Sequence, residues 1–282
     1  MLKHLFCDHD SREKTSAKRT YPMKLAIAGK GGSGKSTIAA ALALSQARVG
    51  RRVLAVDADP DANLASALGV PVEEQRRIVP ISEQRALIEE RTGAKVRQYG
   101  QMFKLNPEVA DIADDYALMH NGVALLVLGA IESGGSGCAC PESVLIKALV
   151  TDLVLHKDEA LVMDMEAGVE HLGRGTARGV DTMLVVLEPS RMSLECAVRV
   201  FRMAGEIDLR DVRVVANKIA SPDDEAWVRE AVPNHEIAAV IHHTPGVRAA
   251  DRDGLPVLDG FGADGRAQID DLLRTLDGGM AE

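Results

Sequence analysis

The segment that most restricts the fold of this chain is AIAGKGGSGKSTIAA, at residues 26–40. Gly29 to Ser36 fits the pattern G-x-x-x-x-G-K-S of a phosphate-binding loop. Such a loop needs a buried strand before it and a helix after it. The apolar run KLAIAG at 24–29 predicts that strand, and the helical pattern at 35–49 predicts that helix. We therefore expect the chain to fold as a P-loop NTPase.

The residue types of the loop suit a nucleoside triphosphate such as ATP. Its glycines let backbone N–H groups curl around phosphate oxygens without Cβ clashes, and the helix N-terminus adds its dipole. Lys35 directs a positive charge toward the β- and γ-phosphates, and Ser36 offers a hydroxyl to Mg²⁺. The predicted nucleotide-binding residues of the loop are Gly29, Lys30, Gly31, Gly32, Ser33, Gly34, Lys35, Ser36 and Thr37.

A second lysine, Lys30, stands early in the loop and has no role in the basic motif. The residues alone leave two interpretations open. Lys30 is either a solvated surface lysine or a charge supplied to phosphates. In the second case the phosphates can belong to a partner subunit, where the lysine would stabilise transition-state charge as an arginine finger does.

Short apolar runs alternate with longer helical patterns along the rest of the chain. The runs are almost continuously apolar, as are strands buried on both faces of a parallel sheet. This alternation predicts right-handed crossovers and a doubly wound, mainly parallel α/β sheet. The expected strands are 24–29, 52–57, 123–129, 159–164, 182–188, 212–217 and 237–241, and the expected helices are 35–49, 82–92, 141–156, 191–205, 222–230 and 264–277.

The domain organisation is expected to be simple. Residues 1–22 are polar and lack periodicity, so we interpret them as a disordered N-terminal extension or an overlong start. Residues 23–277 form a single predicted ATPase domain, in which 70–122 is the least regular stretch and is expected to be an insertion. Residues 278–282 are expected to be a disordered tail.

Composition weighs against several classes of partner. The chain has 33 Lys and Arg residues against 42 Asp and Glu, a net charge of −9, which disfavours nucleic acid or an anionic membrane as the main partner. No apolar run approaches the roughly 18 to 20 residues of a membrane span, and the N-terminus has no secretory signal pattern. A chain this long does not need a disulfide framework, so the four cysteines do not indicate one. The expected location is the cytoplasm.

The loop GKGGSGKST resembles the deviant Walker A loop of the MinD/ParA/nitrogenase-iron-protein class of dimeric ATPases. The resemblance implies a homodimer in which Lys30 reaches the nucleotide of the other subunit. VDADPDANL is similar to switch I of this class, which implies that Asp59 orients the attacking water. LVMDMEAGVEH is similar to Walker B and switch II, which places Asp164 on the Mg²⁺ shell and Gly168 near the γ-phosphate. The residues expected to act in catalysis are Lys30, Lys35, Asp59 and Asp164.

The run VVANK resembles the strand end at which this class reads adenine, which implies that Asn217 hydrogen-bonds the base. An Asn at the end of a strand is also a common turn former. After IAAVI the class usually continues with a proline beside the base, whereas this chain has His242 and His243. Adjacent side chains on an extended segment point to opposite faces, so the pair does not indicate a metal site. The residues that form the far wall of the adenine pocket are not predicted.

Three functions within the class are weighed. A partitioning or positioning ATPase would need a basic patch or a membrane-binding helix, but the last helical segment carries more acid than base. An iron-protein-like reductase would need cluster-holding cysteines far apart in sequence, and none lies near MEAGVE. GGSGCACPESVL followed by VMDMEAGVEHLGRGTARGVD resembles the CooC type of carbon monoxide dehydrogenase accessory ATPase through nearly all of 23–277. This resemblance implies dimerisation driven by ATP and nickel delivery to a client enzyme, carbon monoxide dehydrogenase.

Cys138 and Cys140 stand one residue apart in a glycine-rich turn before a helix. They are too close for an ordinary disulfide and supply half of the four ligands of a structural zinc site. Without the resemblance they could equally be two small buried residues. The CooC-type resemblance implies that they bind metal, and a two-fold dimer would bring four thiolates together around one Ni²⁺ or Zn²⁺. Cys7 and Cys196 are given no role.

Overall fold

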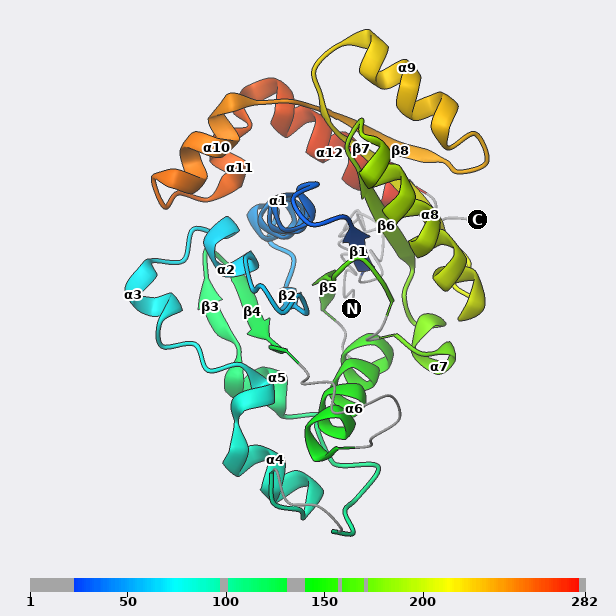
Figure 1. Cartoon of the computed structure of the whole chain (residues 1–282). Helices are drawn as coiled ribbons and strands as arrows, with labels where there is room; N and C mark the ends of the chain where they lie inside the picture. The colour runs from blue at the N-terminus through cyan, green and yellow to red at the C-terminus, as the bar shows by residue number, and fades with distance from the viewer. Residues whose placement is uncertain (1–22, 97–100, 131–139, 157–158, 170–171, 279–282) are drawn as a thin grey trace, which may run out of the picture.

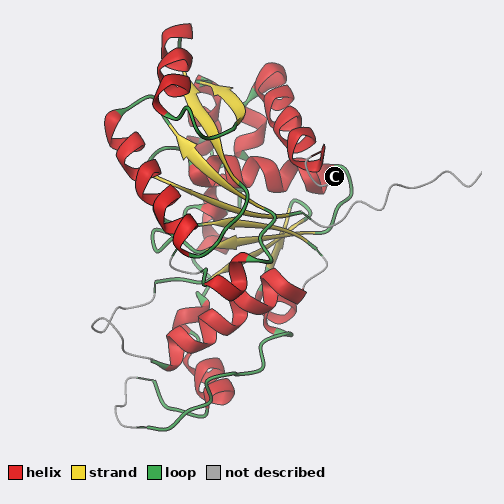
Figure 2. Cartoon of the chain, turned by 90° about the vertical axis from the view of Figure 1, so that its right-hand side faces the viewer, coloured by secondary structure: helices red, strands yellow, loops and turns green. Residues whose placement is uncertain are grey.

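The protein is described by a computed structural model that covers residues 23–96, 101–130, 140–156, 159–169 and 172–278. An eight-stranded sheet runs through them in the order β3-β4-β2-β5-β1-β6-β7-β8. Neighbouring strands are parallel except β3 and β4, which are antiparallel. Helices cover both faces of the twisted sheet (Figure 1), which is seen from the side in Figure 2. The predicted doubly wound α/β fold is confirmed.

The strands form where the sequence has its apolar runs. β2, β5 and β6 are buried at every residue, and β1 is buried at all but its first. Burial on both faces explains why these strands do not alternate between apolar and polar residues. The strands are β1 (Lys24–Gly29), β2 (Val53–Asp57), β3 (Leu118–His120), β4 (Val123–Val127), β5 (Ala160–Asp164), β6 (Thr182–Leu187), β7 (Val212–Ile219) and β8 (Ile237–His242).

One face of the sheet packs against a layer built around α1. The buried alanines of α1, which include Ala39, Ala40 and Ala41, carry small side chains that fit closely over the strands. The C-terminal helices complete this layer, with Ile269 and Leu272 buried in the same cluster. Its helices are α1 (Lys35–Arg48), α2 (Leu64–Ala67), α10 (Pro245–Arg252), α11 (Val257–Gly260) and α12 (Gly262–Gly278).

The opposite face packs against the remaining long helices. Two of them begin at serine caps: Ser190 Oγ accepts from the backbone N–H of Ser193, and Ser221 Oγ accepts from that of Asp224. Such caps satisfy N–H groups that a helix leaves unpaired at its start. The helices of this face are α4 (Arg85–Thr92), α5 (Ile112–Tyr116), α6 (Pro141–His156), α7 (Arg174–Ala177), α8 (Arg191–Glu206) and α9 (Pro222–Ala231).

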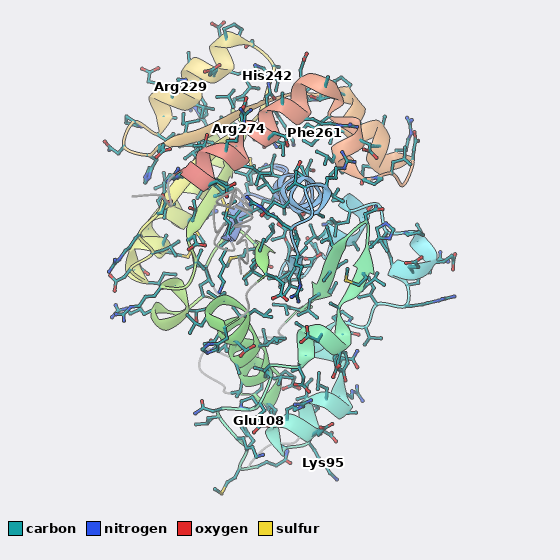
Figure 3. All side chains as sticks on the ribbon, turned by 180° about the vertical axis from the view of Figure 1, so that it is seen from behind. Lys95, Glu108, Arg229, His242, Phe261 and Arg274 are labelled. Atoms are coloured by element: carbon teal, nitrogen blue, oxygen red, sulfur yellow. The ribbon has the colours of Figure 1, made fainter. Side chains whose placement is uncertain are left out.

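The stretch 70–122 contains short elements rather than a long loop. It holds α3 (Val72–Gln75), a 3₁₀ helix η1 (Ile81–Glu83), α4, α5 and the edge strand β3. Apart from α4, these elements were not predicted, because segments of three to five residues are too short to show a hydrophobic period. Lys95 and Glu108 mark the end of the molecule that this stretch forms, far from Arg229 and His242 (Figure 3).

The topology brings the ends of several strands together. In a parallel sheet all carboxyl ends lie at one edge, so the residues that follow β1, β2, β5, β6 and β7 meet there. This edge carries the predicted site.

Among the described residues, no helix is both long and apolar enough to cross a membrane.

Candidate active site

The phosphate-binding loop lies between β1 and α1, as predicted, and has little room for side chains. Gly34 has a φ of 100°, and a Cβ on it would collide with the amide of Asn217. A Cβ on Gly29 would lie 2.5 Å from the carbonyl oxygen of Val186. Gly31 and Gly32 face open space, so the outer side of the loop is free for a ligand. The glycine pattern therefore has a steric cause at both ends of the loop.

Two consecutive residues at the end of β7 donate hydrogen bonds to the backbone of the loop. Asn217 Nδ2 donates to the carbonyl oxygen of Ser33 at 2.8 Å, and Lys218 Nζ donates to that of Gly32. Neighbouring side chains of a regular strand point to opposite faces. Here the pairing of β7 with β8 is irregular between Ala216 and Ile219, and Lys218 has a φ of +60°, so both side chains reach the loop.

The predicted base-binding residue Asn217 is thus 6% exposed and already engaged with the loop backbone. Its contact with adenine stays a prediction. His242 and His243, at the end of β8, are exposed. The backbone N–H of His242 donates to Gln268 Oε1 at 3.1 Å, and its ring lies beside the same side chain.

Lys35 and Asp59 are brought together beside the phosphate-binding loop. Lys35 Nζ lies 3.3 Å from Asp59 Oδ2, and the two side chains are 7% and 14% exposed. The other oxygen of Asp59 accepts from the backbone N–H of Asp61 at 3.1 Å. The two residues predicted to contact the γ-phosphate and its attacking water are therefore adjacent in the structure.

Asp164, the last residue of β5, is fully buried, and neither of its carboxylate oxygens has a hydrogen-bond partner among the described residues. Burial raises its pKa to about 7, against the lowering influence of Ser36 and Lys35. The Ser36 hydroxyl is close enough to affect this pKa, although no hydrogen bond of acceptable geometry joins the two side chains. A buried carboxylate without donors beside a free hydroxyl is a donor set that fits Mg²⁺.

Asp57 lies next to Asp164 in the sheet and was not predicted as a site residue. It ends β2, is fully buried, and pairs in register with Asp164. Its oxygens accept from the backbone N–H groups of Asp59 at 3.2 Å and Leu64 at 2.9 Å. Burial raises its pKa to about 6, although these two hydrogen bonds act in the opposite direction.

Lys30 is held within its own subunit by a carboxylate that sequence reasoning also missed. Lys30 Nζ lies 3.2 Å from Glu188 Oε1, and Lys218 Nζ lies 3.2 Å from Glu188 Oε2. Burial alone would raise the pKa of Glu188, but hydrogen bonds from Lys218 and Lys30 outweigh it and lower that pKa. The side chain of Lys30 is still 30% exposed. In this structure Lys30 is therefore paired with a carboxylate of its own chain, and its role toward a second subunit's nucleotide stays a prediction.

The remaining predicted site residues that the structure describes are Thr37, Gly168 and Cys140. Thr37 is half-buried in the first turn of α1, and Gly168 is buried in the segment after β5. Cys140 is half-buried at the start of α6, where its Sγ lies 3.0 Å from Ser143 Oγ and accepts from the Ser143 backbone N–H at 3.4 Å. Cys138 lies outside the described residues. Within those residues, no group of three or more His, Cys, Asp or Glu side chains is arranged to hold a metal.

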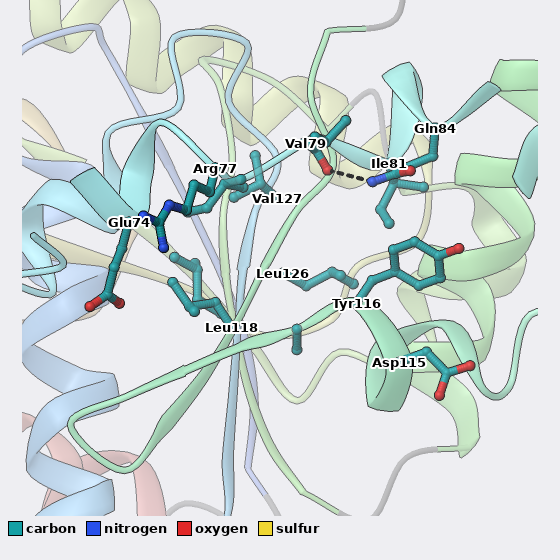
Figure 4. Close-up of a pocket in the computed structure, with 13 residues that line it drawn as sticks. Glu74, Arg77, Val79, Ile81, Gln84, Asp115, Tyr116, Leu118, Leu126 and Val127 are labelled. Carbon is teal, nitrogen blue, oxygen red and sulfur yellow. Dashed lines mark hydrogen bonds between the residues drawn. The ribbon is translucent and has the colours of Figure 1, made fainter. Parts of the chain in front are cut away.

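A separate pocket of about 290 Å³ lies at the other end of the sheet (Figure 4). It is lined by Val79, Tyr116 and Leu118 among others, and Gln84 Nε2 donates to the carbonyl oxygen of Val79 at 3.1 Å. Because β2 and β5 separate β4 from β1, this pocket is not part of the phosphate site.

The comparison with known proteins agrees with this geometry. Residues 24–257 match the family described as the CobQ/CobB/MinD/ParA nucleotide binding domain. The chain belongs to this family. The carbon monoxide dehydrogenase accessory protein CooC of Rhodospirillum rubrum is 42% identical over 237 residues, 84% of this chain and 90% of that protein. An uncharacterized ATP-binding protein of Methanocaldococcus jannaschii is 46% identical over 203 residues, 72% of this chain and 77% of that protein.

Among solved structures, the MinC:MinD cell division complex of Aquifex aeolicus matches with a TM-score of 0.65 at 22% identity, over 90% of this chain and 96% of that chain. This likeness shows the shared fold. The resemblance to the CooC type is confirmed by the sequence identity, and the chain is an ATPase of the CobQ/CobB/MinD/ParA family. The signal that could have found Asp57, Glu188 and Lys218 is their common position: each lies at or just beyond the end of an apolar run that forms a parallel strand.

Proposed function

We propose that this protein is an ATP-hydrolysing maturation factor that couples ATP-dependent dimerisation to nickel delivery into carbon monoxide dehydrogenase. The observation that carries the proposal is the 42% identity with the accessory protein CooC over 90% of that protein's length. The same identity argues against the alternatives of a partitioning or positioning ATPase and of an iron-protein-like reductase. The geometry at the carboxyl edge of the sheet supports the hydrolytic part, and the cysteine pair of the sequence supports the metal part.

The hydrolytic part of the proposal rests on the residues that meet at the carboxyl edge of the sheet. Lys35 would bind the β- and γ-phosphates once ATP separates it from Asp59. Asp59 would then be free to orient the attacking water. Ser36 and Asp164 would hold Mg²⁺, which neutralises phosphate charge when bound. Mg²⁺ binding would keep Asp164 ionised in spite of its raised pKa.

Dimerisation involves the contact between Lys30 and Glu188. In the single chain Lys30 pairs with Glu188 at 3.2 Å, so it has to leave this carboxylate before it can reach a second subunit's nucleotide. A charge supplied in trans to the transition state is worth roughly 10³- to 10⁵-fold in rate in related phosphoryl-transfer sites. We therefore infer that ATP in both subunits exchanges the pairing of Lys30 within the subunit for one between subunits.

The metal part rests on the two cysteines that precede α6 in the sequence. Cys140 lies at the start of this helix with its thiol half-buried, and Cys138 is two residues before it. One such pair leaves coordination positions open, whereas two pairs across a two-fold axis supply four thiolates. Nickel is the cargo of this site, and Zn²⁺ is the alternative ion that the same ligands would accept. Metal and ATP would favour the same dimer and therefore strengthen each other's binding.

The test is nickel transfer to a defined client. Purified protein loaded with Ni²⁺ is mixed with nickel-free carbon monoxide dehydrogenase, and carbon monoxide oxidation is followed with ATP or with a non-hydrolysable analogue. We expect activation only with hydrolysable ATP, and none with Asp59→Asn or with the double variant Cys138→Ser, Cys140→Ser.

Equal activation by the double cysteine variant and the wild type would contradict the metal site. Equal activation with the non-hydrolysable analogue would contradict coupling to hydrolysis. Arg76→Gln is a matched control, because Arg76 is exposed and forms an ion pair with another exposed side chain, that of Glu73.

A further inference from the structure

One carboxylate holds both ends of the segment that carries Asp59. Asp57 Oδ1 accepts from the backbone N–H of Asp59 at 3.2 Å, and Asp57 Oδ2 accepts from that of Leu64, seven residues further along the chain, at 2.9 Å. The Asp57 side chain is fully buried at the end of β2. Both of its oxygens are therefore committed to the backbone of residues 59–64.

The two bonds do different things. The first closes the tight turn that aspartate commonly forms with the N–H two residues on. The second reaches the first residue of α2, whose N-cap residue Asn63 provides no side-chain hydrogen bond. The N–H of Leu64 would otherwise be one of the unpaired donors that every helix has at its start. Asp57 thus fixes the position of α2 as well as that of the turn.

Asp59 is confined between these two fixed points. The backbone N–H of Ala62 donates to the carbonyl oxygen of Asp59 at 2.9 Å, and Ala62 itself has a positive φ of 24°. The Asp59 carboxylate accepts from the N–H of Asp61 and reaches Lys35 at 3.3 Å with its other oxygen. The position of this carboxylate is therefore set by a backbone conformation that Asp57 maintains.

A neutral residue could not replace both bonds. An asparagine side chain has one oxygen acceptor, and its NH₂ group would face an N–H donor. A serine hydroxyl could accept in the tight turn but would not extend to Leu64. The second bond thus distinguishes Asp57 from a simple turn-forming residue.

We propose that Asp57 is a positioning residue for ATP hydrolysis, which acts by holding the backbone that places the Asp59 carboxylate opposite Lys35. This inference rests on the proposed role of Asp59. In this role Asp57 would act through the backbone N–H groups of Asp59 and Leu64, without contact to the phosphates or the attacking water. Displacement of a catalytic group by about 1 Å can cost up to roughly 10²-fold in rate.

The test compares Asp57→Asn with Asp57→Ser and with Asp61→Asn, an exposed aspartate in the same segment that serves as control. We expect kcat to fall roughly 10- to 100-fold in both Asp57 variants and to stay unchanged in Asp61→Asn. The Kd for a non-hydrolysable ATP analogue should stay within about twofold of the wild type in all three. Rates are expressed per analogue-binding site, so that unfolded protein does not contribute.

The double variant Asp57→Asn, Asp59→Asn decides whether Asp57 acts through Asp59. We expect it to hydrolyse ATP no more slowly than Asp59→Asn alone, because nothing remains to be positioned. Multiplication of the two losses, or wild-type kcat in both Asp57 variants, would overturn the inference. Full turnover in Asp59→Asn would instead overturn the proposed role of Asp59. This single variant is measured in the same series, so the two failures are distinguishable.

Discussion

The carboxyl edge of the sheet and the start of α6 differ in how many contacts of the proposed site lie within one chain. At the sheet edge, Lys35, Lys30 and Asp57 each have a partner of the same chain at 3.3 Å or closer. At the start of α6, the Cys140 thiol contacts Ser143 of its own helix. The nucleotide-binding residues are therefore held by contacts within one chain, whereas the metal site proposed above would draw its four thiolates from two chains.

This difference separates the steps of the proposed cycle that need one chain from the steps that need a dimer. Nucleotide binding should be a property of the single chain. Hydrolysis and metal binding should both depend on the dimer, since in the proposed cycle Lys30 and the cysteine pair would each supply half of a shared arrangement. The first three of the following four experiments test this division, and the fourth tests the buried Asp164 of the nucleotide site.

The largest expected effect belongs to Lys35→Ala. The loop would lose its charge directed at the β- and γ-phosphates, and Asp59 would lose its ion-pair partner. We expect no measurable ATP binding by isothermal titration calorimetry and no ATP-dependent dimer. Wild-type affinity in this variant would show that the nucleotide site lies elsewhere.

The next effect is that of Lys30→Ala, which should leave ATP binding intact and reduce kcat by about 10³-fold. Sedimentation of the variant with ATP should show a monomer. Mixing it with Lys35→Ala protein tests whether the lysine acts in trans, since each chain then lacks a different function. Normal dimerisation and turnover by Lys30→Ala would favour the alternative that this lysine only pairs with Glu188.

A smaller effect is expected for the cysteines, because it concerns the metal alone. We expect wild-type protein with ATP to bind one Ni²⁺ or Zn²⁺ per dimer in equilibrium dialysis. Loss of an outer-shell partner lowers metal affinity roughly 10- to 100-fold. Cys140→Ser removes a proposed ligand itself, so we expect it to lower the affinity by more than this. Cys196→Ser, which removes a buried thiol of α8, is the matched control for metal stoichiometry. Unchanged metal binding in the Cys138→Ser, Cys140→Ser double variant would make the pair structural.

The smallest effect is a pH dependence of the ligand-free protein. The pKa of Asp164 rises from 3.8 to about 7 on folding, so folded protein keeps a proton that unfolded protein loses over this range. Its contribution to stability is fully present below pH 3.8 and is lost as the pH rises through about 7. In EDTA, the free energy of unfolding should therefore fall less between pH 5 and about pH 8 in Asp164→Asn than in the wild type. Parallel curves for the two proteins would contradict the raised pKa.

Sequence reasoning predicted the parts of this molecule that are continuous in the chain. The apolar runs of β1, β2, β5 and β6 identify buried parallel strands, and the phosphate loop follows from its glycines and Lys35. Sequence reasoning did not find the contacts between residues that are distant in sequence. Glu188 pairs with Lys30 across 158 positions, and Lys218 reaches Gly32 across 186. No local pattern marks such contacts, because they depend on the order of strands in the sheet.

The contact between Gly34 and Asn217 has a consequence for how this sequence can change over time. A Cβ at position 34 would collide with the Asn217 amide, and that amide also bonds the carbonyl oxygen of Ser33 at 2.8 Å. Substitutions at positions 34 and 217 are therefore coupled: neither site can drift alone without damage to the other. Anyone who redesigns the loop for a different nucleotide has to redesign the end of β7 in the same step.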